Sequence, residues 1–279
     1  MNSNNMFIHI PDVSQIKQFD AQFISPRSVI MVLGKRGTGK TTMVNHLISE
    51  LYERYDDFYV FSKTASLNFP YPFPWCPEKN RIDGLNISKL LEIYNKQKED
   101  IKKYQNIDDK RVKHICVLLD DVISDDIIAK RGSNTLLVEL ACNSRHAKMD
   151  LYLTSQVLQS GFSPQIRKNI DYFFAFRIND GSTMEGFCKL YLSRFKKLGP
   201  IIVDNITNFD NYYTIVADNK ESSKMKSITD YIYKYRAELK KEYKFNKKED
   251  SKPQNEDINL WQNLILDSDY DNLGDDDYI

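Results

Sequence analysis

The sequence has no long hydrophobic run, no net charge and few cysteines. No apolar stretch reaches the length of a transmembrane helix, and the start of the chain is polar, so we expect a soluble intracellular protein with no stable membrane insertion. The four cysteines form no C-x-x-C pair, which argues against a zinc site or a disulfide framework. The 39 basic and 39 acidic residues cancel, so net charge favours no class of partner.

A glycine-rich segment at residues 34–42 matches the pattern G-x-x-x-x-G-K-[ST]. It lies between an apolar run at 28–33 and an amphipathic pattern at 40–54, so a strand and a helix would aim its backbone N–H groups at phosphate oxygens. Lys40 would reach the β- and γ-phosphates, and the Thr41 hydroxyl would bind Mg²⁺. The segment predicts an ATP site formed by Gly34, Lys35, Arg36, Gly37, Thr38, Gly39, Lys40, Thr41 and Thr42.

Apolar runs alternate with helical patterns along most of the chain. The expected strands are 28–33, 57–62, 114–119, 150–155, 171–177 and 212–216. Helical patterns occupy 40–54, 86–104, 134–148, 164–170 and 182–195. This alternation predicts an α/β fold, that of a P-loop NTPase with a mainly parallel, doubly wound sheet flanked by helices. Ligands of such a fold bind at the carboxyl ends of the strands.

Composition divides the chain into four parts. Residues 1–26 form an N-terminal lead, and residues 27–218 form the P-loop ATPase core. Residues 219–248 carry ten basic and four acidic side chains with apolar residues at helical spacing, which predicts a basic amphipathic helix. Residues 249–279 carry one basic and ten acidic side chains, which predicts an acidic, flexible tail. Such a tail could cover a surface used by DNA phosphates, or could serve only solubility.

A second element places two carboxylates after an apolar strand. Asp120, at the tip of the strand, is suited to hold Mg²⁺ directly or through a water molecule. Asp121, one residue further on, is suited to orient or deprotonate the water that attacks the γ-phosphate. The chain contains no Asn-Lys-x-Asp motif for reading guanine, which argues against a GTPase.

A third element is the strand expected at 150–155, which is directly followed by Gln156. In a doubly wound sheet the end of this strand would lie beside the two carboxylates. Gln156 could then hydrogen-bond the γ-phosphate or its attacking water and report hydrolysis to the rest of the protein. The alternative is a strand that simply ends in a hydrophilic loop.

In this order the three elements resemble the FtsK–HerA superfamily of DNA-pumping ATPases. More narrowly, the chain is similar to the poxvirus-type genome-packaging ATPases of large DNA viruses. The resemblance covers roughly residues 27–215. Outside the P-loop it rests on Asn143-Ser144-Arg145-His146 before the strand that ends at Gln156, and on residues 164–169 before an aromatic strand.

The resemblance implies a homo-oligomeric ring, pentameric or hexameric, with nucleotide at the subunit interfaces. It implies double-stranded DNA in the pore, contacted at its phosphates without sequence specificity, and a capsid or portal-site protein as partner. It also implies an arginine finger supplied by a neighbouring subunit, for which Arg145 is the first candidate and Arg167 the second. Asp121 stands where many members of the superfamily have glutamate, so its role as the base is less secure than that of Lys40.

The function expected from these elements is an ATP-hydrolysing DNA translocase that packages a double-stranded viral genome into capsids. Its expected location is the virion or the viral factory in the host-cell cytoplasm. One alternative is another P-loop enzyme, either a nucleotide kinase or a helicase-like ATPase. A second is a nucleotide-switched capsid assembly factor that does not move DNA. Hydrolysis stimulated by DNA would separate the translocase from the assembly factor.

Overall fold

The structure, a computed structural model, describes residues 15–122, 131–158, 162–208, 212–220, 227–238 and 245. Most of the expected N-terminal lead and all of the expected acidic tail at 249–279 therefore lie outside the described residues.

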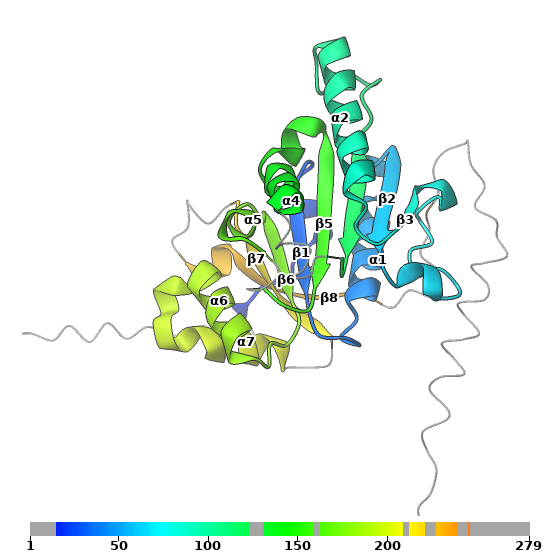
Figure 1. The fold of residues 1–279 in the computed structure, drawn as a ribbon. Helices are drawn as coiled ribbons and strands as arrows, with labels where there is room; N and C mark the ends of the chain where they lie inside the picture. Colours follow the sequence, from blue (N-terminus) through cyan, green and yellow to red (C-terminus); the bar gives the residue numbers. More distant parts are fainter. Residues whose placement is uncertain are drawn as a thin grey trace, which may run out of the picture.

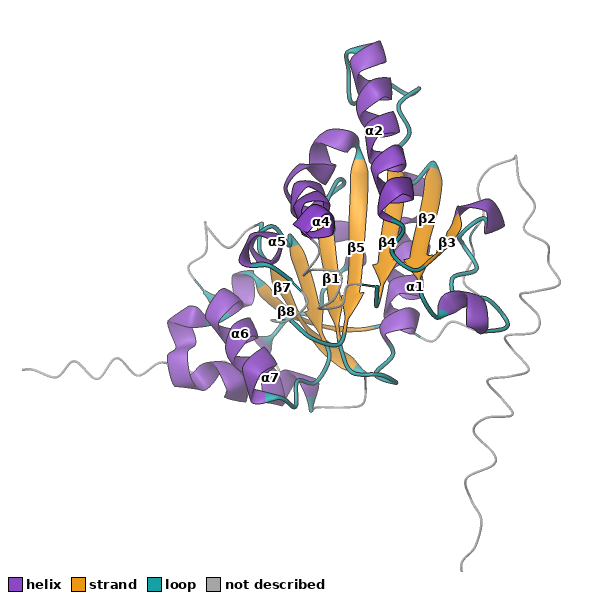
Figure 2. Ribbon diagram, viewed as in Figure 1, coloured by secondary structure: helices purple, strands orange, loops and turns teal. Residues whose placement is uncertain are grey.

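The described residues form one eight-stranded sheet in the order β3-β2-β4-β5-β1-β6-β7-β8 (Figures 1 and 2). The strands from β3 to β6 in that order run parallel, whereas β7 and β8 are antiparallel to their neighbours. Their bounds are β1 Val29–Leu33, β2 Asp57–Ser62, β3 Arg81–Asp83, β4 Ile115–Asp120, β5 Met149–Ser155, β6 Tyr172–Ala175, β7 Tyr213–Asp218 and β8 Ile232–Arg236.

Helices cover both faces of this sheet, which confirms the predicted doubly wound fold. Helix α1, Lys40–Leu51, packs on one face together with residues near the N-terminus and the 65–76 loop. The opposite face is covered by α2 Ile87–Tyr104, α4 Arg131–Asn143, α5 Pro164–Lys168, α6 Gly181–Tyr191 and α7 Gly199–Thr207 (Figure 1). Strands β1, β4 and β5 are buried along their whole length, as expected for parallel strands between two helical layers.

The C-terminal part of the core corrects one prediction. The described residues of 219–248 form no amphipathic helix of the predicted kind. They contain a short 3-10 helix at Ile228–Asp230 and then β8, which pairs antiparallel with β7. Ile232 and Tyr235 are both buried, but they pack on opposite faces of the sheet. Apolar residues three apart, which predicted a helix, therefore arise here because both faces of a strand are buried. The tyrosines of this segment also favour the extended conformation.

The N-terminal residues also belong to the packed core. Residues 17–19 run beside β8, where Phe19 N donates to Lys234 O (2.9 Å) and Lys234 N donates to Lys17 O (3.0 Å). The side chains of Ile16, Phe19 and Ile24 are buried. The core thus extends past the expected boundaries of 27–218 at both ends.

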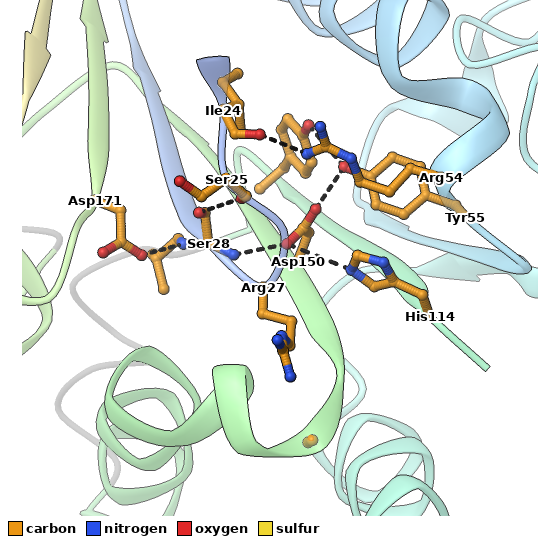
Figure 3. Close-up of polar contacts among 12 residues, drawn as sticks. Ile24, Ser25, Arg27, Ser28, Arg54, Tyr55, His114, Asp150 and Asp171 are labelled. Atoms are coloured by element: carbon orange, nitrogen blue, oxygen red, sulfur yellow. Dashed lines mark hydrogen bonds and ion pairs between the residues drawn. The ribbon is translucent and has the colours of Figure 1, made fainter. Parts of the chain in front are cut away.

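Buried carboxylates anchor the amino ends of the central strands (Figure 3). Asp150 of β5 is fully buried, and its two oxygens accept hydrogen bonds from Ser28 N (2.6 Å) and Tyr55 Oη (2.7 Å). His114 Nε2 lies 3.6 Å from the same carboxylate. Asp171 Oδ2 accepts from Val29 N at 2.8 Å. These bonds pair the backbone N–H groups of Ser28 and Val29, at the start of β1, with buried acceptors.

No helix in the described ranges combines the length and the apolar character needed to cross a membrane.

Candidate functional site

The tight loop between β1 and α1 depends on glycines, because other residues there would clash or strain the backbone. A Cβ atom on Gly34 would collide with Thr38 Oγ1 and would lie 2.9 Å from the ring of Phe176. Gly39 has φ +94°, in the left-handed region that side chains disfavour. Gly34 N donates to Ser155 O (3.0 Å), which ties the loop to the end of β5. Lys35, Arg36 and Gly37 are exposed at the crest of the loop.

The ammonium group of Lys40 lies inside this loop. Its Nζ donates to Gly34 O at 3.0 Å and lies 3.3 Å from Asp121 Oδ2. The Lys40 side chain is only 8% exposed, so its charge is held in place by the loop and the carboxylate. The structure thus brings the first and second predicted elements into direct contact.

Three polar side chains from neighbouring strands meet beside Lys40. Ser62 of β2, Asp120 of β4 and Thr154 of β5 are partners across the parallel pairs, so they lie side by side on the face that α1 covers. Ser62 Oγ donates to Asp120 Oδ2 (2.9 Å), and Thr154 Oγ1 donates to Asp120 Oδ1 (2.7 Å). Each carboxylate oxygen therefore has a fixed hydrogen-bond donor.

Burial raises the pKa of Asp120 above the usual value of an aspartate. The hydrogen bonds from Thr154 and Ser62 oppose this rise, the nearby charge of Asp121 adds to it, and Lys40 opposes it. A cation placed against this carboxylate would restore its charged form.

Asp121 differs from its neighbour in backbone and surroundings. It has φ +46°, and its N–H donates to Thr154 Oγ1 at 3.0 Å. This conformation turns its carboxylate toward Lys40 and toward Gln156, whose Nε2 lies 3.4 Å from Asp121 Oδ2. As predicted, the strand that ends at Gln156 pairs directly with the strand that carries the two carboxylates.

The oxygen atoms of Asp120 and Thr41 are of the kind that binds Mg²⁺. Asp120 supplies a carboxylate at the strand tip, and the partly buried Thr41 stands at the second position of α1. The described residues contain no cluster of three or more histidine, cysteine or acidic side chains suited to a metal ion. Magnesium commonly binds through one or two protein oxygens together with phosphate oxygens and water, so this donor set fits it.

The two candidate arginine fingers lie away from this site. Arg145 is exposed in a 3-10 helix at Ser144–Ala147, immediately before the start of β5. Arg167 belongs to α5, which precedes β6. Both therefore lie toward the amino edge of the sheet, whereas the P-loop lies at the carboxyl edge. Within one chain neither arginine is in reach of a nucleotide at the P-loop.

Sequence reasoning did not single out two residues of the site. Ser62 and Thr154 hold Asp120, and Thr154 also accepts the N–H of Asp121. Their signal in the sequence is weak, since each is one small polar residue at or near the end of an apolar strand. Their role depends on strand order and register.

The fold and this edge of the sheet define a P-loop NTPase. A family model described as "Poxvirus A32 protein" matches residues 16–198. The chain belongs to this family, which confirms the resemblance to poxvirus-type genome-packaging ATPases that the sequence motifs carried.

The chain is also similar to one curated protein over part of its length. Uncharacterized protein 075L of Invertebrate iridescent virus 6 is 32% identical over 173 residues, which cover 58% of this chain and 62% of that protein. The matching region thus spans less than two thirds of that relative.

Solved structures share the fold at low sequence identity. The genome packaging NTPase B204 from Sulfolobus turreted icosahedral virus 2, in complex with AMP, is 13% identical with a TM-score of 0.53; the match covers 77% of this chain and all of that one. The pCW3 conjugation coupling protein TcpA, in a monomer form with ATPγS, is 13% identical with a TM-score of 0.55 and covers 82% of this chain and 70% of that one. At these identities the likeness establishes the fold alone.

Proposed function

We propose that the protein hydrolyses ATP with Mg²⁺ and uses the energy to move double-stranded viral DNA into capsids. The observation that carries the proposal is the position of Asp121 between two other predicted site residues. Its Oδ2 lies 3.3 Å from Lys40 Nζ and 3.4 Å from Gln156 Nε2. Membership of the poxvirus A32 family supports a packaging role.

Each residue of the cluster has a distinct role in this proposal. The loop of residues 34–42 binds the phosphates through backbone N–H groups, and Lys40 neutralises charge that develops on the β- and γ-phosphates. Thr41 and Asp120 hold Mg²⁺, which when bound offsets phosphate charge. Asp121 orients the attacking water and accepts its proton, and Gln156, hydrogen-bonded to Asp121, responds to the loss of the γ-phosphate.

An arginine from a neighbouring subunit completes the site in this proposal. Arg145 or Arg167 would supply this guanidinium to the site of the next subunit. Both lie at the amino edge of the sheet, too far from the P-loop of their own chain at the carboxyl edge. The protein would therefore act as a ring of identical subunits, pentameric or hexameric.

Double-stranded DNA is the proposed cargo, and a capsid or portal-site protein is the proposed docking partner. The similar Sulfolobus virus protein is a genome packaging NTPase, which supports DNA as the cargo. Contacts with DNA would be made to phosphates and would weaken steeply with added salt. The protein would be located in the virion or in the viral factory of the host-cell cytoplasm.

The decisive experiment measures ATP hydrolysis with and without double-stranded DNA. We expect hydrolysis by the parent protein to rise with DNA and to be abolished in Lys40→Ala. The fold of this variant should persist, because the Lys40 ammonium contacts loop carbonyls and Asp121 and is not part of the hydrophobic core. Lys89→Ala, on the exposed surface of α2, is the matched control and should hydrolyse like the parent. Phosphate transferred to a nucleoside would indicate a kinase, and nucleotide binding without DNA-stimulated turnover would indicate an assembly factor. Electron microscopy with an ATP analogue and DNA would show whether a ring encircles the duplex.

A further inference from the structure

The order of the strands indicates which end of a nucleotide bound at the P-loop lies toward which side of the sheet. On one side of β1 lie β5 and β4. Gln156 directly follows β5, and the carboxylates Asp120 and Asp121 lie at the carboxyl end of β4. These groups act on the γ-phosphate in the proposed function. On the other side of β1 lie β6 and β7. A triphosphate with its γ end toward β4 and β5 therefore has its nucleoside end toward β6 and β7.

An exposed tyrosine stands at that second side. Tyr212 directly precedes β7, and because β7 is antiparallel to β6, its start lies at the same edge of the sheet as the P-loop. A Cβ atom built on Gly39 lies 3.5 Å from Tyr212 Cδ1 and 3.7 Å from Phe176 Cζ. Phe176 is buried under the loop, but Tyr212 is 53% exposed. The Phe176 ring thus packs against the loop inside the protein, whereas the Tyr212 ring lies beside the loop and is open to solvent.

The backbone of Tyr212 is also unusual. Its φ of +75° lies in the left-handed region, where a bulky residue is rarely found. A ring that is more than half exposed gains little from burial to offset this strain. Strained residues of this kind concentrate at functional sites, where the surrounding structure fixes a side chain for a ligand.

We propose that Tyr212 is the stacking platform for the base of the bound nucleoside triphosphate. The inference rests on the proposed function in one respect, that a nucleotide occupies the P-loop with its γ-phosphate toward Asp121. Every base presents a flat π face, so stacking on a tyrosine is tolerant of base identity. The site therefore takes nucleoside triphosphates as a class, with little selection among their bases.

The test compares ligands with and without a base. Binding of the non-hydrolysable analogue AMPPCP and of inorganic tripolyphosphate, each with Mg²⁺, is measured by calorimetry for the parent, Tyr212→Asn and Tyr212→Phe. Asparagine tolerates the left-handed backbone but has no aromatic ring. Phenylalanine keeps the ring and lacks only the hydroxyl group. The control is Phe23→Ala, which removes an aromatic ring that is 64% exposed at the opposite edge of the sheet.

We expect Tyr212→Asn to weaken AMPPCP binding by roughly 5- to 150-fold while its affinity for tripolyphosphate stays unchanged. Tyr212→Phe and Phe23→Ala should bind both ligands like the parent. Equal AMPPCP affinity in Tyr212→Asn and the parent would overturn the proposal. An equal loss of both ligands in Tyr212→Asn would also overturn it, because Tyr212 would then only support the loop. A parent that binds AMPPCP but hydrolyses no ATP would contradict the proposed function and leave the stacking result readable.

Discussion

Asp120 and Asp121 show how two adjacent carboxylates acquire different chemistry. Asp120 is buried and fixed by Ser62 and Thr154. Asp121 is partly exposed and turned by its left-handed backbone toward Lys40. A fixed carboxylate suits a metal ligand, which must keep its geometry. A carboxylate held by a single cation beside solvent suits a group that handles water.

The first prediction tests this division of roles. Asp121→Asn should bind ATP with Mg²⁺ nearly as the parent does but hydrolyse it on the order of 10²-fold more slowly, because the water loses its proton acceptor. Asp120→Asn should instead weaken the dependence of binding on Mg²⁺. Nucleotide binding titrated against Mg²⁺, together with single-turnover hydrolysis, separates the two effects. Identical losses of Mg²⁺-dependent affinity in both variants would refute the assignment.

The second prediction concerns the buried carboxylate at the other edge of the sheet. Asp150→Asn should lower the free energy of unfolding by about 2–4 kcal/mol. The Ser28 N–H and the Tyr55 hydroxyl donate to different oxygens of Asp150, and in asparagine one of these is replaced by an NH2 group that cannot accept. Burial, followed by the charge of Asp150, raises the pKa of Tyr55 well above its usual value, so that hydroxyl remains a donor.

Urea unfolding would measure the effect of Asp150→Asn. Asp108→Asn is the matched control, because Asp108 is an exposed aspartate that pairs with Arg27 at 3.5 Å, and its loss should cost about 0.5 kcal/mol or less. Similar stabilities of the two variants would show that the Asp150 network contributes nothing particular to the fold.

At this scale the sequence predicted the residues that belong to a contiguous motif. The spacing of glycines and Lys40 identifies the P-loop, and a strand ending in Asp120 and Asp121 identifies its partner. Ser62 and Tyr212 could not be predicted in the same way. Ser62 reaches Asp120 only because β2 and β4 pair in one particular register, and Tyr212 reaches the P-loop only because β7 runs antiparallel to β6.

At the scale of elements, strong periodicity identified most of the central structure. Strands β1, β2, β4, β5 and β6 were all expected near their observed places. The short strand β3 and helix α7 were missed, because β3 has only three residues and α7 follows closely on another helical segment. Residues 219–248 were misread, since apolar residues three or four apart also arise when a strand is buried on both faces.

The third prediction tests the packing of Tyr235, a residue of β8, in the core. Tyr235 packs against Phe19 and Phe174, and its hydroxyl lies 2.7 Å from His46 Nδ1. Tyr235→Ala should lower the free energy of unfolding by about 3–5 kcal/mol, since it removes a buried ring from the core. Arg236→Ala, one residue along on the exposed side, should cost about 1 kcal/mol or less. Thermal unfolding of both variants measures the difference, and equal stabilities would contradict the burial of Tyr235 in the core.

At the scale of the whole molecule, the arginine candidates fix how subunits could meet. Arg145 precedes β5, a strand of seven residues, so it lies about 20 Å from the carboxyl edge at the rise of a parallel strand. A finger at Arg145 or Arg167 therefore requires the amino edge of one sheet to face the carboxyl edge of the next. The strands of each subunit would then point around the ring.

The fourth prediction uses mixed rings to test this arrangement. Arg145→Ala subunits and Asp121→Asn subunits should each be inactive alone, on the order of 10³-fold below the parent for loss of a finger. Rings that contain both should regain some hydrolysis, because one type of interface combines an intact Arg145 with an intact Asp121. The ATPase rate measured across mixing ratios should pass through a maximum. A flat, inactive profile in rings shown to co-assemble would exclude Arg145 and direct attention to Arg167.

The two outer strands of the sheet restrict the way in which copies of this chain can associate. At one edge, residues 17–19 hydrogen-bond to β8 and cover it. At the other edge, β3 offers only the three residues Arg81–Asp83. Within the described ranges the sheet thus lacks a long unpaired edge, so neighbouring molecules cannot join by extending it strand by strand. Contacts that the described residues make between copies would instead involve side chains, which can part and re-form without breaking a ladder of backbone hydrogen bonds. An assembly joined in this way can change the spacing of its subunits during each cycle while every subunit stays folded.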